Sequence, residues 1–116
     1  VKFALAHISW PWTDECIATF GRVPAAAGWD NPSQMYIDIT RGTPRYYRTE
    51  ALDKALKFAG PERLIYGSDG KVPSDFSFSR ERVDIDHDII VHELGYTEEE
   101  FRMISRDNFN DFLKPL

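Results

Sequence analysis

The chain has 116 residues, which is enough for one modest domain and too few for two. Hydrophobic residues make up 42% and charged residues 28%, a balance that is typical of globular proteins and argues against intrinsic disorder. The net charge of −5, without a cluster of Lys and Arg, argues against a nucleic-acid-binding surface, and no apolar run approaches the roughly 20 residues of a membrane span.

The single cysteine indicates the compartment of the protein, and the first residues indicate whether the chain is part of a longer one. Cys16 cannot form an intrachain disulfide, which favours a reducing, cytoplasmic compartment, and we interpret it as a small packed hydrophobe. The chain begins at Val1, inside a segment that already has the pattern of a buried strand. We therefore expect a piece of a longer protein.

The N-terminal segment predicts a strand, a helix and a loop. Residues 1–7 (VKFALAH) form a nearly continuous apolar run, as in strands that are buried on both faces of a parallel sheet. Residues 13–20 predict a helix, because acidic residues early in the segment suit the positive end of the helix dipole. Residues 21–33 are rich in Gly, Pro and Ala and predict a loop.

The middle of the chain repeats this order. Residues 35–40 (MYIDIT) are rich in β-branched residues and predict a second strand, in which Asp38 alternates with isoleucines. We interpret Asp38 as a satisfied core carboxylate, with a supporting hydrogen bond to a site as the alternative. Residues 41–47 predict a loop. Residues 49–58 have apolar residues along one helical face, and a Gly-Pro pair ends that helix.

A third strand and a further helix follow. Residues 64–66 predict a strand that leads into the sequence Gly-Ser-Asp-Gly, and the polar residues up to Glu81 predict a loop. Residues 85–94 predict a helix that a glycine closes. His87 and His92 lie five residues apart, which is the wrong spacing for two side chains to share one face of an α-helix.

The last segment, residues 97–113, is the clearest helix. Thr97 and Glu100 have the spacing of a capping box, in which each side chain satisfies a backbone amide of the other residue. The expected buried stripe consists of Phe101, Ile104, Phe109, Phe112 and Leu113. Strands that alternate with helices predict an α/β fold with a parallel sheet and right-handed crossovers. Such a small sheet has exposed edges, so we expect another chain or the rest of a larger sheet to cover them.

Two side chains at strand ends are the candidates for chemistry. His7 closes the first predicted strand, and Asp69 follows the third one closely. Because ligands of α/β folds bind at the carboxyl ends of parallel strands, we expect both side chains at one rim. A histidine and an aspartate there are natural metal ligands or a general acid–base pair. The alternatives are a structural histidine and an aspartate that only initiates a turn.

Several segments of the chain resemble one enzyme family. LAH (residues 5–7), MYIDIT (35–40), GPERLIYGSD (60–69) and ISRDNFNDFL (104–113) resemble, in this order, the sixth, seventh and last strands and the closing helix of the amidohydrolase-related family, which includes enzymes of the carboxymuconate-semialdehyde decarboxylase type. The resemblance implies that residues 1–116 form a single partial domain. This domain would be the C-terminal portion of a TIM-like (β/α)₈ barrel, about three parallel strands with outer helices.

The same resemblance implies roles for the two candidates. Asp69 is the expected ligand of a divalent metal, usually zinc, and His7 is the expected base that faces the metal-bound water or the substrate. Such a metal lowers the pKa of its bound water toward neutrality, and a neighbouring imidazole and carboxylate orient that water and move its proton. The family's His-x-His pair is absent from the chain, so this scheme leaves the metal site incomplete.

Two further segments belong at the mouth of the predicted barrel. Trp10 follows the first strand and is predicted to wall the pocket, with loop packing as the alternative. Arg45 lies in the predicted loop after the second strand, next to Tyr46, Tyr47 and Arg48. This loop is predicted to bind an anionic group of the substrate, with a solvated loop and aromatic packing as the alternative.

Two hypotheses of function follow. In the first, the chain is part of a metal-dependent hydrolase that cleaves the C–N or lactone C–O bond of a small molecule, or part of a non-oxidative decarboxylase. It is then inactive alone, and it associates with a missing N-terminal part or forms a homo-oligomer. In the second, the chain is a non-enzymatic α/β module that binds itself or a partner through its exposed sheet edges.

Overall fold

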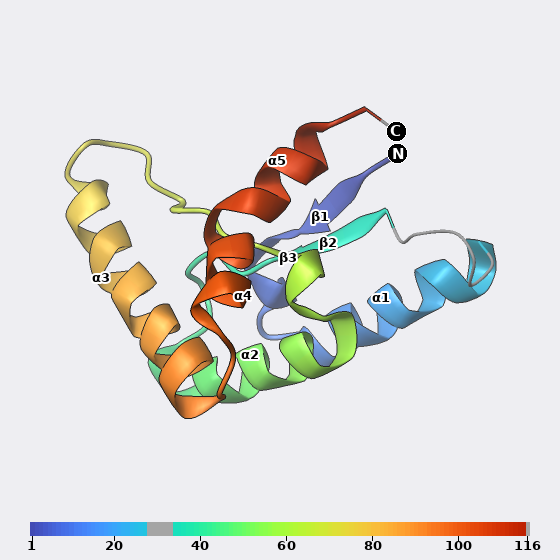
Figure 1. Ribbon diagram of the computed structural model, residues 1–116, viewed down its shortest axis with the longest axis horizontal. Coiled ribbons are helices and arrows are strands. Elements are labelled where there is room, and N and C mark those ends of the chain that lie inside the picture. Colours follow the sequence, from blue (N-terminus) through green and yellow to red (C-terminus); the bar gives the residue numbers. More distant parts are fainter. Residues whose placement is uncertain (28–33, 116) are drawn as a thin grey trace.

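Three short parallel strands form the centre of the molecule (Figure 1). The computed structural model describes residues 1–27 and 34–115. The strands are β1 (Phe3–Leu5), β2 (Met35–Asp38) and β3 (Leu64–Ile65), and they lie side by side in chain order. A helix connects each strand to the next, so the predicted α/β fold with a parallel sheet and surrounding helices is confirmed. Its origin in a (β/α)₈ barrel stays a prediction.

The strand register divides the sheet into two faces. One face carries Phe3, Leu5, Met35, Ile37 and Leu64, and the other carries Ala4, Tyr36, Asp38 and Ile65. The first face packs against α1 (Thr13–Ala27) and α2 (Arg45–Ala59), and much of the hydrophobic core lies in this contact. Cys16 of α1 is buried there, which confirms its interpretation as a packed hydrophobe.

A short C-terminal helix, α5 (Asn108–Leu113), covers part of the second face near the amino ends of the strands (Figure 1). The ring of Phe112 meets the ring of Tyr36 edge to face, with the centroids 5.3 Å apart. Lys2 Nζ donates a hydrogen bond to the backbone carbonyl of Asp111 at 2.7 Å. Since α5 lies at the amino ends, the carboxyl ends of the strands stay open for a site.

Two helices are longer than the sequence pattern indicates. α1 continues to Ala27, because its alanine-rich end favours a helix over the predicted loop, and residues 28–33 of that loop lie outside the described residues. α2 begins at Arg45 rather than at residue 49, directly after Pro44. Proline suits the start of a helix, where its missing amide hydrogen leaves no bond unmade. The loop predicted at the barrel mouth is therefore mostly the first turn of α2.

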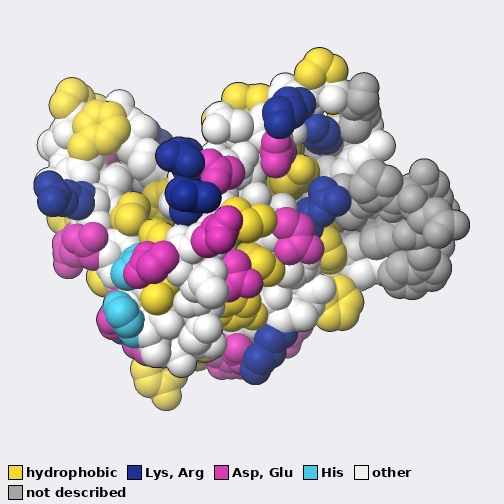
Figure 2. All heavy atoms as spheres, in the orientation of Figure 1, with side chains coloured by type: hydrophobic (Ala, Val, Ile, Leu, Met, Phe, Trp, Pro, Cys, Tyr) yellow, Lys and Arg dark blue, Asp and Glu magenta, His cyan; other side chains and the backbone are white. Residues whose placement is uncertain are grey.

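The polar segment up to residue 81, predicted as a loop, contains the first half of α3 (Asp75–His87). Asp75 accepts hydrogen bonds from two backbone amides of the preceding turn, at 2.9 and 3.3 Å, which fixes the start of the helix. Phe76 and Phe78 are exposed, so no buried apolar face marks this part of the helix in the sequence. Figure 2 shows apolar side chains at the exposed end of α3.

A π-helical segment, Asp88–Glu93, continues α3 and brings two histidines together. Its hydrogen bonds join residues five apart, as in the bond from the amide of Leu94 to the carbonyl of Ile89 at 2.8 Å. Side chains five positions apart can then share a face. The ring centroids of His87 and His92 lie 5.5 Å apart, so the expectation that their spacing separates them is wrong.

The last helical region consists of α4 (Glu98–Arg102), a π-helical segment (Met103–Asp107) and α5. The capping box is confirmed, because Thr97 and Glu100 exchange hydrogen bonds at 2.7 and 3.1 Å. Among the described residues, no helix has the length and apolar character that crossing a membrane requires.

The apolar stripe of this region is only partly buried. Phe101 and Ile104 are buried as predicted, but Phe109 and Leu113 are exposed. The prediction is wrong for Phe109 and Leu113. The π-helical segment before them changes the helical register, so residues at α-helical spacing on its two sides do not share one face.

Candidate functional site

His7 lies in a strained turn at the carboxyl end of β1. The strand ends at Leu5, earlier than predicted, and a 3₁₀ turn (Ala6–Ser9) follows. His7, Ile8 and Ser9 have left-handed backbone angles, with φ of 58°, 52° and 52°. Residues other than glycine are strained at such angles, and Ile8 is fully buried, so the core holds the turn in place.

One hydrogen bond fixes the orientation of the imidazole ring. His7 Nδ1 lies 2.6 Å from the carbonyl oxygen of Arg41, in the segment after β2. Because a carbonyl oxygen only accepts, Nδ1 carries a hydrogen, and Nε2 of the neutral ring keeps a free electron pair. Gly42 permits this close approach, since a Cβ atom there would lie 2.9 Å from Cβ of His7. Nε2 is therefore suited to take up a proton or to bind a metal ion.

Asp69 lies in the loop after β3, at the same edge of the sheet. It is exposed, and its φ of 51° is also left-handed. The loop passes close to the end of β2, because a Cβ atom on Gly67 would lie 2.7 Å from Thr40 Oγ1. Asp38 accepts hydrogen bonds from the backbone amide of Thr40, at 2.7 Å, and from its hydroxyl. These bonds satisfy one carboxylate oxygen of Asp38 and stabilise the strand end that the loop crosses.

His7 and Asp69 line one open cleft, which we call the His7 cleft. Its volume is about 500 Å³, which is within the range of small-molecule sites. The other lining residues are Trp10, Arg41, Gly42, Thr43, Pro44, Arg45 and Arg82. Three arginines and a single aspartate make the cleft electropositive in a chain whose net charge is −5. The structure thus places the predicted substrate-binding residues Trp10 and Arg45 in the same cleft as His7 and Asp69.

A buried ion pair lies next to the His7 cleft. Arg48, expected at the barrel mouth, is instead buried, and its guanidinium donates to both carboxylate oxygens of Asp86 at 2.9 and 2.7 Å. Arg48 Nη1 and the buried hydroxyl of Thr43 have no hydrogen-bond partner among the described residues. Arg48 lines a small cavity beside the cleft, and Arg41, Thr43 and Arg82 line both spaces.

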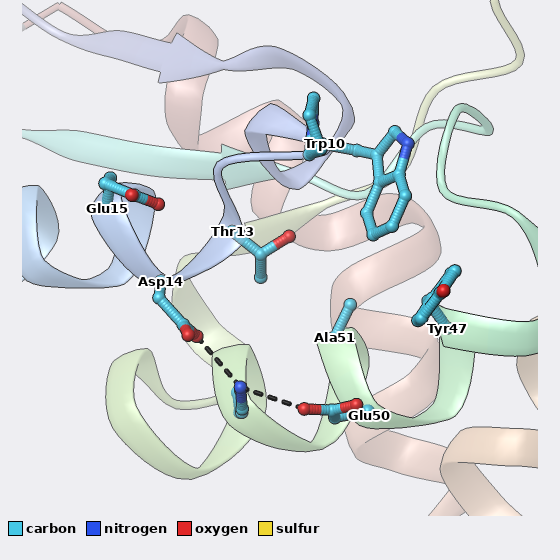
Figure 3. Close-up of a pocket in the computed structure, with 9 residues that line it drawn as sticks. Trp10, Thr13, Asp14, Glu15, Tyr47, Glu50 and Ala51 are labelled. Atoms are coloured by element: carbon cyan, nitrogen blue, oxygen red, sulfur yellow. Dashed lines mark hydrogen bonds and ion pairs between the residues drawn. The ribbon is translucent and has the colours of Figure 1, made fainter.

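A second cleft, the Lys54 cleft, shares Trp10 with the first (Figure 3). Its volume is about 450 Å³, and its lining consists of Trp10, Pro11, Thr13, Asp14, Glu15, Tyr47, Glu50, Ala51 and Lys54. Trp10 stacks on Tyr47 with the ring centroids 4.9 Å apart. Lys54 Nζ lies 3.0 Å from a carboxylate oxygen of Asp14 and 3.0 Å from one of Glu50, as the dashed lines in Figure 3 show. Three carboxylates and a single lysine make this cleft electronegative.

The structure adds three polar or charged side chains to the predicted residues of the His7 cleft: Arg41, Thr43 and Arg82. Arg41 directly follows the second strand pattern, so the rule that ligands bind at strand ends is sufficient to select it. Arg82 belongs to a helix without a marked apolar face in the sequence, and no signal places it near His7. Thr43 is polar but buried, and no pattern indicates this.

The described residues do not make up a complete metal centre. Residues 1–27 and 34–115 contain no group of three or more His, Cys, Asp and Glu side chains that could hold a metal ion. For Asp69 to bind a metal ion, further ligands would have to come from outside these residues.

No protein-family model, curated protein or solved structure matches the chain. The resemblance to the amidohydrolase-related family therefore stays a prediction from the sequence.

Proposed function

We propose that the chain supplies one rim of the active site of a metal-dependent hydrolase or non-oxidative decarboxylase. Asp69 contributes one carboxylate ligand to a divalent metal ion, with zinc as the expected ion, and His7 acts as the base toward the substrate side. The remaining metal ligands come from a missing N-terminal part of the protein or from another copy of the chain. The substrate is a small molecule of a size that the His7 cleft accommodates.

The position of His7 and Asp69 carries this proposal. Both follow parallel strands at their carboxyl ends, both have a left-handed backbone, and both line the same cleft. Strained backbone at two positions that line one cleft indicates that something other than stability determines these residues. The hydrogen bond from Nδ1 of His7 leaves Nε2 free for proton transfer.

The sheet edges support the association that the proposal requires. Within the described part of the chain, β1 and β3 each pair with β2 alone, so each has one edge without a neighbouring strand. Such edges offer unpaired backbone groups to another strand. We expect sedimentation to show an oligomer, or a complex with the missing part where both are present, and a strictly monomeric, well-behaved chain would count against this association.

Equilibrium dialysis against zinc tests the metal proposal. We expect about one zinc ion per chain or per oligomer, lost in Asp69→Ala because the remaining ligands do not hold the ion. Asp84→Ala is the matched control, because Asp84 is exposed on α3 and lines neither cleft. Equal, non-zero zinc content in wild type and Asp69→Ala would contradict the assignment of Asp69 as a metal ligand. No zinc in the wild type would contradict a site completed by another copy of the chain and would leave only ligands from the missing N-terminal part.

A further inference from the structure

The small cavity beside the His7 cleft contains two buried polar groups that lack a partner. It is lined by Arg41, Thr43, Arg48, Arg82, Ile85 and Asp86, and its volume of about 10 Å³ suits a single water molecule or oxygen atom. Arg48 and Thr43 are only 4% and 6% exposed, and neither Nη1 of the arginine nor the threonine hydroxyl has a partner among the described residues. Because buried N–H and O–H groups are rarely left unpaired, an acceptor belongs in this cavity.

The charges around the cavity favour an anion as that acceptor. Asp86 is already held by two hydrogen bonds from Arg48 and cannot neutralise further arginines. Arg41 and Arg82 line both the cavity and the cleft, and neither side chain has a hydrogen bond or ion pair within the described residues. Arg45 is paired with Glu93 at 3.8 Å, and Asp69 is the single carboxylate in the lining of the cleft. Arg41 and Arg82 therefore leave an excess of about one positive charge, which suits a singly charged anion better than a doubly charged one.

We propose that the cavity and the adjoining part of the His7 cleft bind the carboxylate group of a small organic acid. One carboxylate oxygen occupies the cavity and accepts hydrogen bonds from the Thr43 hydroxyl and from Arg48 Nη1. The other oxygen faces the guanidinium groups of Arg41 and Arg82, whose planar shape matches a carboxylate. The inference that the substrate is an organic acid rests on the proposed function. The binding of the anion itself does not, because it requires no metal.

An NMR titration of the full chain tests this site. Backbone amide shifts are followed while acetate is added in the presence of EDTA, and acetamide, which has the same shape without the charge, is the neutral control. We expect saturable shifts at residues 41–43 and 82–86 with acetate only. Arg41→Gln and Arg82→Gln should each weaken acetate binding roughly tenfold or more, because each removes a charged hydrogen-bond donor. Arg80→Gln, which changes an exposed arginine of the same helix, should leave it unchanged.

Thr43→Val tests the buried donor directly, because valine keeps the shape and removes the hydroxyl that lacks a partner. Weaker acetate binding in this variant, with a native spectrum, supports the proposal. Undiminished binding in Thr43→Val or in Arg82→Gln, no saturable shift in the wild type, or equal shifts with acetamide would overturn it and assign the cavity to water. Since EDTA excludes metal ions, a negative titration leaves the zinc result untouched, and a failure of zinc binding leaves this proposal standing.

Discussion

The His7 cleft and the Lys54 cleft share Trp10 and have similar volumes, but the ion pairs in or next to them differ in their exposure to solvent. In the Lys54 cleft the paired carboxylates of Asp14 and Glu50 are 73% and 65% exposed, so water screens their attraction to the lysine. Next to the His7 cleft, the side chains of Arg48 and Asp86 are 5% and 4% exposed. The buried pair cannot be solvated when it is broken, so it fixes the shape of its surroundings, whereas the exposed pairs do not.

The largest expected effect comes from breaking the buried pair. Asp86→Ala leaves Arg48 charged and unpaired in the interior, and we expect a loss of about 3–5 kcal/mol in the free energy of unfolding. Urea unfolding measures the loss. Asp88→Ala, an exposed change two residues later, should stay near wild type, and Lys54→Gln at the second cleft should change the midpoint little. If the first two variants are equally stable, the contrast between the clefts is wrong.

A smaller but more local effect is expected from Gly42→Ala. The added Cβ would lie 2.9 Å from His7 Cβ and 3.0 Å from its Nδ1, and the buried neighbour Ile8 prevents the turn from moving away. We expect a loss of about 1–3 kcal/mol from this overpacking, together with changed ring resonances of His7 as its bond to Arg41 is disturbed. Gly70→Ala is the control, because its Cβ would approach the Ser68 hydroxyl at 3.3 Å on an exposed loop. Unchanged ring resonances in Gly42→Ala would show that the ring does not depend on this contact.

Local patterns account for the parts of the fold and site that could be predicted. The β-branched run at residues 35–40 and the Thr97–Glu100 capping box depend on interactions between residues close together in the sequence, and both elements form. His7 and Asp69 follow from a rule about strand ends, which depends only on finding the strands.

The remaining features depend on contacts that the sequence does not display. The pairing of Arg48 with Asp86 joins residues 38 apart in the sequence. The sequence pattern around Arg48 therefore predicts a loop, and only the contact between α2 and α3 shows that this side chain is buried and paired. The apolar residues at the start of α3 are exposed, and the π-helical segments change the helical register, so periodicity is misleading in both places.

A smaller difference in stability is expected from backbone strain at the His7 cleft. Asp69 has a left-handed backbone, which glycine adopts freely and alanine does not, so Asp69→Gly should be about 1 kcal/mol more stable than Asp69→Ala. At Ser68, which is not among the residues of positive φ, the order of glycine and alanine should reverse. Thermal unfolding of the four variants checks this. Equal stability of the two Asp69 variants would remove strain as an argument for function at this cleft.

The smallest effect is expected at the Lys54 cleft, as a dependence on pH. Hydrogen bonds to Asp14 and Glu50 raise the pKa of Lys54 above its ordinary value of 10.5. A raised pKa in the folded state means that the stabilisation is complete below the ordinary pKa and is lost as the pH rises through the folded pKa. Lys54→Gln should therefore flatten the alkaline fall in stability slightly, and less so at high salt, because the pairs are exposed.

The measurement is the urea midpoint of wild type and Lys54→Gln across the alkaline range. Lys71→Gln is the matched control, because Lys71 is exposed and its side chain has no ion pair among the described residues. A difference that follows Lys54 alone and shrinks with salt assigns the alkaline effect to the exposed pairs. A salt-resistant difference of the size expected for Asp86→Ala would mean that the Lys54 cleft is as desolvated as the His7 cleft, and charge burial would then no longer distinguish the two.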